Sequence, residues 1–267
     1  MVRKPAVAGQ FYTNDSQRLR AQIETLIAVR GPKKKVMGII SPHAGYVYSG
    51  AVSGEVYGRV EIPETVLILG PNHHGLGSRA AISLKGEWLT PLGSVPVNAS
   101  LAELILKNSP LMQEDMTAHQ YEHSIEVQVP FLQVARPDVR IVPLCLGLLD
   151  FESCKNMGIS LVKAVREYGK EVLIVASSDM SHYEPDKVAR EKEEMTLREL
   201  LALNPEGLYS VVREMEITMC GVIPATVMLV AAREMGATKG ELVRYATSGD
   251  VSGDYRQVVG YAAVTVE

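Results

Sequence analysis

Four short apolar runs recur along the chain, and each ends in polar or glycine-rich residues. The runs are KVMGIIS at 35–41, ETVLILG at 64–70, VRIVPLCLG at 139–147 and EVLIVASSD at 171–179. Near-continuous apolar segments of this kind are typical of strands in a sheet that is covered on both faces. The tail, ELVRYATSGD followed by GYAAVTVE, predicts two further strands joined by a loop that contains glycine and aspartate.

Amphipathic segments lie between these runs and predict helices at 98–108, 123–135, 152–167, 185–203 and 222–235. Asn98 or Ser100 is a candidate N-cap for the first of them. The segment at 123 is ambiguous, because HSIEVQV also alternates like a strand and Pro130 must lie near a helix start or at a kink. Strands that alternate with helices predict one α/β domain, residues 1–267, with a central sheet covered by helices on both faces.

Composition narrows the class of protein. A hydrophobic fraction of 46%, a charged fraction of 22% and a mean hydropathy close to zero are those of an ordinary globular protein. The net charge of -4 argues against a nucleic-acid binder. No apolar stretch approaches the roughly 20 residues that span a bilayer, and MVRKPAVAGQFY lacks the apolar segment of a signal peptide. We therefore expect a cytoplasmic protein that binds neither nucleic acid nor membrane.

Polar residues gather where the predicted strands end. His43 follows the first strand in SPHAGYVYSG, His73 and His74 follow the second in GPNHHG, and Asp179 and His182 follow the fourth in SSDMSHYEP. In open α/β sheets, side chains beyond the carboxyl ends of strands converge on one edge. Histidine is the commonest metal ligand and suits proton transfer near neutral pH. A lone histidine is usually a loop residue, but three such loops predict a functional site.

Each loop leaves alternatives open. Adjacent side chains in an extended loop point in different directions, so at most one of His73 and His74 is expected to be a direct ligand. Asp179 lies three residues before His182 and either orients that ring or caps a helix that starts near Pro185.

The segment HQYEHSIEVQ adds further polar side chains at helical spacing. His119 and His123 are four residues apart, as are Glu122 and Glu126. The order of residues is not that of the HExxH zinc signature, because the glutamate is in the wrong place. The alternative for this segment is a charged helix start.

The three cysteines contain no CxxC pair, which argues against a disulfide framework or a structural zinc knuckle. Cys220, in TMCGVIPA, precedes a predicted helix, and a helix N-terminus lowers the pKa of a thiol. We therefore expect Cys220 to be a thiolate ligand or a nucleophile. Cys145 and Cys154 lie in a predicted strand and a predicted helix and are expected to be inert.

Several motifs together resemble the Memo family (mediator of ErbB2-driven cell motility). They are PHAGYVYSG, LGPNHH, EHSIEVQVPFL, SSDMSHY and MCGVIPA, with RKPAVAGQFY at the start, so that the resemblance covers essentially the whole chain. Prokaryotic members are also described as AmmeMemoRadiSam system protein B. The resemblance implies a fold similar to that of class III extradiol dioxygenases, which are non-haem iron(II) enzymes.

The resemblance also implies a metal pocket formed by His43, His74 and Cys220, with His74 preferred to His73. A His₂Cys set is softer than the two histidines and one carboxylate of the dioxygenases, and it suits copper or zinc as well as iron(II).

By the same resemblance, His182 matches the acid/base histidine of the dioxygenases, and Asp179 lies beside it. Glu122 and His123 are expected near the pocket.

Two functions follow as hypotheses. The first is a metal-dependent redox or oxygen-using enzyme that acts on an unknown small molecule. The second is a non-catalytic module that binds a peptide or a phosphorylated ligand. The family name also implies a partner associated with radical-SAM chemistry; this chain has no CxxxCxxC cluster motif of its own.

Overall fold

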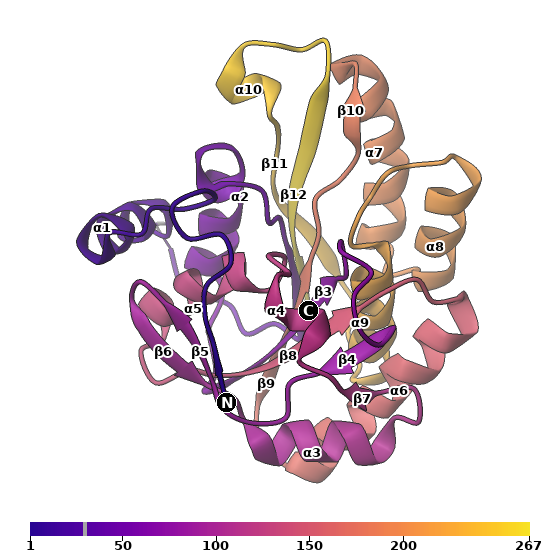
Figure 1. Cartoon of the computed structure of the whole chain (residues 1–267). Helices are drawn as coiled ribbons and strands as arrows, with labels where there is room; N and C mark the ends of the chain where they lie inside the picture. The colour runs from indigo at the N-terminus through magenta and orange to yellow at the C-terminus, as the bar shows by residue number, and fades with distance from the viewer. Residues whose placement is uncertain (29–30) are drawn as a thin grey trace.

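The computed structural model describes residues 1–28 and 31–267. Over these residues a central nine-stranded sheet has the order β10-β12-β2-β9-β3-β8-β4-β7, with β11 also paired to β12 (Figure 1). The strands are β2 (Gly38–Ser41), β3 (Thr65–Pro71), β4 (Ala80–Ile82), β7 (Gln113–Glu114), β8 (Arg140–Leu146), β9 (Val172–Ser177), β10 (His182–Glu184), β11 (Gly240–Thr247) and β12 (Val258–Val266).

Four strands in the middle of the sheet are parallel, and the strands on either side of them are antiparallel to them. β2, β9, β3 and β8 run parallel to one another, whereas β12 is antiparallel to β2 and β4 is antiparallel to β8. The four apolar runs are these four parallel strands, and the tail forms the antiparallel pair β11 and β12. Every residue of β2 and β3 is buried, which explains their continuous apolar character. All six strand predictions are confirmed.

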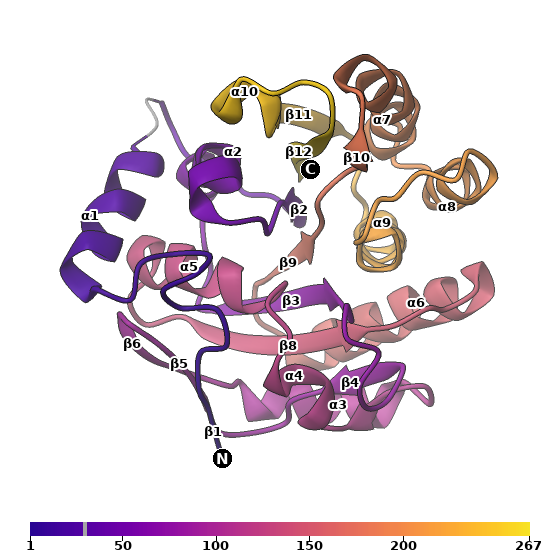
Figure 2. The same cartoon turned by 45° about the horizontal axis from the view of Figure 1, so that its top comes forward.

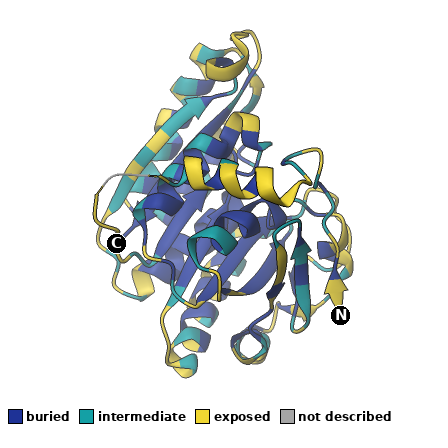
Figure 3. Cartoon of the chain, turned by 90° about the vertical axis from the view of Figure 1, so that its left-hand side faces the viewer, coloured by how far each residue is buried: buried dark blue, intermediate teal, exposed yellow. Residues whose placement is uncertain are grey.

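Helices cover both faces of this sheet (Figure 2). One face carries α1 (Ser16–Leu26), α2 (Tyr46–Arg59) and α5 (Val129–Ala135). The other carries α3 (Ala99–Asn108), α6 (Phe151–Tyr168), α7 (Asp186–Leu201), α8 (Pro205–Glu214) and α9 (Val222–Glu234). Figure 3 shows the central strands as buried and the outer surface of α1 as exposed. The predicted α/β fold class is confirmed.

The predicted helices are present, with one change of form. Asn98 caps α3 by accepting a hydrogen bond from the Leu101 amide at 3.2 Å, as expected. The ambiguous segment at 123–135 is not a strand. It forms a 3₁₀ turn (Glu126–Gln128) followed by α5, with Pro130 in the first helical turn, where no amide hydrogen is needed. Helices α1, α2 and α8 were not predicted.

Short elements complete the chain around the sheet. A separate three-stranded sheet contains β1 (Val2–Arg3), β5 (Glu87–Thr90) and β6 (Gly93–Pro96). Two short helices, α4 (Thr117–Gln120) and α10 (Gly249–Ser252), lie in loops. No helix in the described part of the chain combines the length and apolar character needed to cross a membrane.

The buried carboxylate of Glu126 fixes the N-terminal segment to the body of the domain. It pairs with the guanidinium of Arg3 and accepts hydrogen bonds from the Ala6 amide at 2.7 Å, the Val7 amide at 3.1 Å and the Tyr12 hydroxyl at 2.6 Å. Both members of the ion pair are buried. Such a pair is costly to break, because the remaining charge stays buried without an opposite charge beside it. Glu126 is therefore structural and not part of a charged helix surface.

His119 is also structural, and it gives the fold a defined sensitivity to acid. Its ring is fully buried against Trp88, with ring centroids 5.7 Å apart. Burial, together with the charge of Arg3, lowers the pKa of His119 from 6.5 to about 4. Above pH 6.5 the ring is neutral in both the folded and unfolded states. Between these two pKa values the unfolded state binds a proton that the folded state excludes, so stability falls as the pH falls.

We expect His119→Phe to remove this part of the acid sensitivity, because phenylalanine keeps an aromatic ring against Trp88 and has no titrating group. The wild-type protein should lose on the order of 3 kcal/mol of unfolding free energy between about pH 6.5 and 4 through this residue alone. Urea unfolding followed by circular dichroism across that range measures the slope. Equal slopes for the two proteins would show that His119 does not contribute.

Candidate metal centre

The parallel pairing of β2, β9 and β3 brings three loops to one edge of the sheet. β9 lies between the other two strands, with Ser41 of β2 opposite Ser177 and Leu69 of β3 opposite Ala176. The loops that leave the carboxyl ends of these strands therefore begin side by side. They carry the polar residues singled out in the sequence: His43, His73, His74, Asp179 and His182.

Three imidazole rings meet at this edge. One ligand atom from each of His43, His73 and His123 lies within 4.8 Å of the others. The ring centroids are 5.1 Å apart for His43 and His73, 5.4 Å for His43 and His123, and 4.6 Å for the stacked pair His73 and His123. His43 is buried, whereas the side chains of His73 and His123 are 29% and 19% exposed. The cluster is thus anchored inside the protein and open on one side.

Ser177 fixes the tautomer of His43. The Ser177 hydroxyl donates to the Ser124 carbonyl at 2.6 Å and accepts a hydrogen bond from the side-chain amide of Gln128 at 2.8 Å. The hydroxyl has one hydrogen, which is therefore already used, so the 2.8 Å contact with Nδ1 of His43 requires that the ring nitrogen be the donor. Nδ1 of His43 carries the proton, and the lone pair lies on Nε2, the nitrogen that faces the cluster.

Glu122 holds the other two rings. Its carboxylate lies 2.8 Å from Nδ1 of His73 and 3.5 Å from Nδ1 of His123, and it accepts the His73 amide at 2.7 Å and the Ser124 amide at 2.9 Å. Burial alone would raise the pKa of Glu122, but these contacts hold it well below its usual range. A carboxylate behind Nδ1 is the usual partner of a metal-binding histidine, because it directs Nε2 toward the metal.

Close backbone packing brings Glu122 to His73. A Cβ atom at Gly70 would lie 2.5 Å from Oγ of Ser124 and 2.6 Å from Cγ1 of Ile125. Only glycine therefore lets the segment that contains Glu122 lie directly against the end of β3.

The histidines of the cluster are poised to bind a cation. Burial, with the neighbouring His123 and His73 rings, holds the pKa of His43 well below its usual range. Burial likewise lowers the pKa of His123 to about 4, although Glu122 opposes the shift. Both rings are therefore neutral near pH 7, with lone pairs available.

Cys220 contacts one member of the cluster, His43, and is not part of the 4.8 Å group itself. Its Sγ lies 3.3 Å from Nε2 of His43. Two donors bound to one metal at about 2.0 and 2.3 Å are about 3.5 Å apart in a tetrahedral arrangement, so the observed spacing suits a shared metal. Gly221 allows this placement, because a Cβ atom there would lie 2.4 Å from the Ser177 carbonyl oxygen and 2.3 Å from the Ser178 side chain.

The expectation that a helix N-terminus lowers the pKa of Cys220 is wrong. Cys220 precedes α9, but burial and the charge of Asp179 raise the pKa of the thiol. Desolvation of a thiolate outweighs the partial charge of the helix end. Without a cation the residue is therefore a thiol. Cys145 and Cys154 are buried with raised pKa values, consistent with the inert role expected for them.

His74 lies outside the group that surrounds His43. Its ring is exposed, and Nε2 donates to the Tyr121 carbonyl at 3.1 Å. It has a ligand atom within 4.8 Å of Glu122 and His123, which forms a second, more exposed group. Of the sequence-predicted ligands, the structure brings His43 and Cys220 together and sets His73, not His74, beside His43. The sequence places His123, in EHSIE, near the pocket and does not mark it as a candidate ligand; the structure sets its ring beside those of His43 and His73.

Asp179 and His182 have different partners from those expected. The buried Asp179 carboxylate accepts hydrogen bonds from the amides of His43, at 2.7 Å, and Ala44, at 3.3 Å. It therefore positions the His43 loop and does not orient His182. Burial raises the pKa of Asp179 despite these bonds. The alternative role as a helix cap is also wrong, because α7 begins at Asp186 without a side-chain cap.

His182 is held by two hydrogen bonds to Thr218. Its Nδ1 lies 2.9 Å from the carbonyl oxygen of Thr218, and its amide donates to the Thr218 hydroxyl at 2.7 Å. A carbonyl only accepts, so Nδ1 carries the hydrogen and Nε2 is left with a lone pair. His182 is close enough for its charge to lower the pKa of both His43 and Asp179.

These observations define an α/β protein with a candidate metal centre on the loops at one sheet edge. Comparison with known proteins identifies its family. The family model described as Memo-like protein matches residues 3–265. A MEMO1 family protein of Aquifex aeolicus is 46% identical over 97% of both chains, and one of Methanopyrus kandleri is 43% identical over 99% of this chain and 98% of its own. The chain belongs to the Memo family, as its motifs indicated.

A solved structure supports the fold. The crystal structure of an uncharacterized protein, JW3007, from Escherichia coli K12 matches with a TM-score of 0.59 at 14% identity, covering 85% of this chain and 98% of the other. The expected similarity to the dioxygenase fold stays a prediction.

We expect Glu122→Gln to weaken the binding of zinc by about 10- to 100-fold, the usual cost of losing a partner behind a ligating histidine. An amide is similar in size but accepts fewer hydrogen bonds and has no charge, so it orients His73 and His123 poorly. Competition with a chelating dye measures the affinity, and Glu103→Gln, an exposed change on α3, is the control. Equal affinity in the two variants would contradict the role of Glu122.

Proposed function

We propose that this protein is a metal-dependent enzyme whose metal is held by His43, His73 and His123, with Cys220 as a further donor. One observation carries the proposal. Three imidazoles from separate loops each have a nitrogen within 4.8 Å of the other two, and a thiol lies 3.3 Å from one of these rings. A chance meeting of surface histidines would not have the two partners, Ser177 and Glu122, that face their Nδ1 atoms.

The donor set fits a first-row transition metal. Imidazole suits iron, copper and zinc, and a thiolate favours copper and zinc. Iron(II) or copper, when bound, would supply one-electron chemistry to a small substrate, and zinc would supply Lewis acidity. The chain's own part is to hold Nδ1 of His43 against Ser177 and Nδ1 of His73 against Glu122, which leaves both Nε2 atoms for the metal.

The exposure of the cluster favours catalysis over a structural role. Structural zinc sites are closed by four protein ligands, so with Cys220 also bound a substrate would need a fifth position on the metal. His73 and His123 face solvent, so one side of the site is accessible. His182 lies nearby with a free nitrogen and would accept or return a proton. Binding of a peptide or phosphorylated ligand, and a radical-SAM-associated partner, stay predictions.

Adjacent histidines provide a matched test of the ligand set. We expect His73→Ala to weaken zinc binding by more than about 100-fold, which exceeds the cost of losing an indirect partner. His74→Ala should change it by less than about 3-fold, as for a surface residue. Isothermal titration of metal-free protein measures both. Loss of binding in His74→Ala with retention in His73→Ala would instead support the set His43, His74 and Cys220.

The thiol can be tested separately by its spectrum. We expect copper(II)-loaded wild-type protein to show an intense thiolate-to-copper charge-transfer absorption, because Cys220 shares the metal with His43. Cys220→Ser should lack this band, and Cys154→Ser, which changes a buried thiol in α6, should keep it. A wild-type spectrum without the band would remove Cys220 from the proposed ligand set while leaving the three histidines untested by this measurement.

A further inference from the structure

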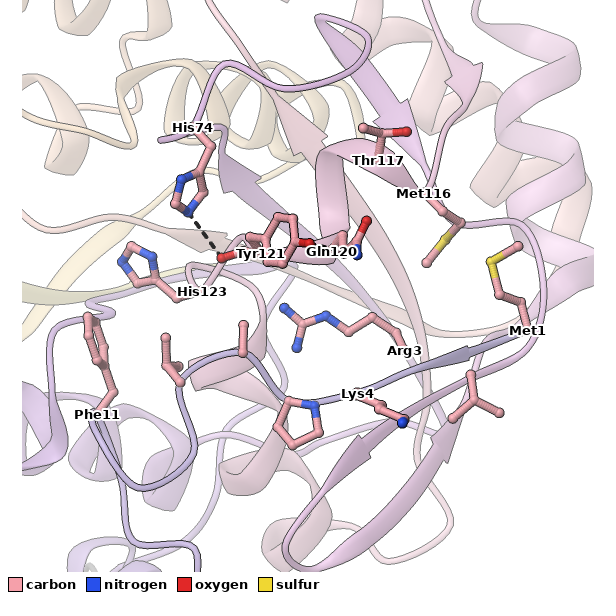
Figure 4. Close-up of a pocket in the computed structure, with 14 residues that line it drawn as sticks. Met1, Arg3, Lys4, Phe11, His74, Met116, Thr117, Gln120, Tyr121 and His123 are labelled. Carbon is pink, nitrogen blue, oxygen red and sulfur yellow. Dashed lines mark hydrogen bonds between the residues drawn. The ribbon is translucent and has the colours of Figure 1, made fainter.

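A cavity of about 940 Å³ opens directly beside the histidine cluster. Its lining includes His123, a member of the cluster, and His74 (Figure 4). In Figure 4 these two histidines lie at one end of the cavity, Met1 and Met116 lie at the other end, and Arg3 lies between them. The volume is within the range of pockets that bury a small molecule. A molecule in this cavity would therefore reach the metal-binding end.

The walls of the cavity are largely apolar. The N-terminal segment forms one wall, and α4 with the residues on either side of it forms the other. Apolar atoms of the lining come from Met1, Val2, Pro5, Ala6, Val7, Phe11 and Met116. Phe11 packs against His123 with ring centroids 4.8 Å apart, so the apolar surface continues to the edge of the cluster. Such walls favour an occupant with a hydrocarbon body.

The charge of the lining has one sign. None of the 14 lining residues is an aspartate or a glutamate, whereas Arg3, Lys4 and the two histidines are basic or can become so. The guanidinium of Arg3 is already engaged by Glu126 and by the carbonyls of His119 and Glu122. The exposed ammonium of Lys4 is the side-chain charge in the lining that remains for a ligand.

We infer that this cavity is the substrate chamber of the proposed metal enzyme and that its occupant is a small organic anion with an apolar body. Lys4 pairs with the anionic group, and the apolar body lies between the N-terminal segment and α4. The inference rests on the proposed function for its link to catalysis, but the affinity of the cavity for such an anion does not depend on a metal.

The first experiment uses metal-free protein, so that the cavity is tested apart from the metal centre. The probes are octanoate, 1-octanol and octylammonium, which share a chain and differ in charge. Isothermal titration should show saturable binding with octanoate the tightest and octylammonium the weakest. Equal affinities for the three probes, or no saturable binding of octanoate, would overturn the inference. Either result leaves the zinc titration of the histidine variants unaffected.

Two variants connect this binding to the named residues. Lys4→Gln should weaken octanoate binding by about 3- to 5-fold, the size expected for an exposed charge pair, and should leave 1-octanol unchanged. Lys163→Gln, an exposed change on α6, is its control. Met116→Trp should fill the cavity and weaken both probes by more than about 10-fold. Met215→Trp, at an exposed position beyond α8, controls for the added ring.

Zinc titration of each variant shows whether the site is still folded, so a lost cavity is distinguished from an unfolded protein.

A final measurement tests the connection to the metal. Octanoate should shift the visible spectrum of copper(II)-loaded wild-type protein and should not do so in Met116→Trp. Binding of octanoate without any spectral shift would place the cavity apart from the metal centre and overturn its role as a substrate chamber. Octanoate affinity unchanged in Met116→Trp would show that the probe binds elsewhere.

Discussion

The parallel pairing of β2, β9 and β3 is the constraint on which the site depends. Adjacent strands lie roughly 4.8 Å apart, so loops that leave the ends of three neighbouring strands start within about 10 Å of one another. His43 and His73 leave the two outer strands and meet above β9, with ring centroids 5.1 Å apart. Residues 30 positions apart thus converge because β2 and β3 run in the same direction, whereas opposite directions would place their loops at opposite edges.

Buried hydrogen bonds turn this proximity into a defined site. Ser177, at the end of β9, contacts His43, Gln128 and the Ser124 carbonyl. A buried polar atom left without a partner costs about 1–3 kcal/mol. None of these side chains can therefore turn away without leaving a buried partner unsatisfied. Glu122 plays the same part for His73 and His123. The side of each ring that faces the protein is therefore fixed, and the side that faces the cluster is left for a ligand.

The sequence was sufficient for the central strands because full burial requires continuous apolar runs, and those runs are visible without any structure. It could not show which of His73 and His74 lies beside His43, because that depends on which side chain faces Glu122, a residue 49 positions away from His73. The prediction of a lowered pKa for the Cys220 thiol was wrong for a similar reason. The helix start is a local feature, whereas the burial that dominates comes from the packing of α9 against β9.

One short segment supports both the histidine cluster and one wall of the cavity. Glu122 faces His73 and His123, and Glu126, in the following turn, fixes the N-terminal segment through Arg3, Ala6 and Val7. Both carboxylates are buried, so neither can shift without loss of hydrogen bonds. If a ligand in the cavity alters the position of this segment, it alters the affinity of the histidines for a metal. Thermodynamic linkage then requires that the metal change the affinity of the cavity by the same factor. The cavity and the cluster share the residues that build them, so any such coupling would raise or lower both affinities together.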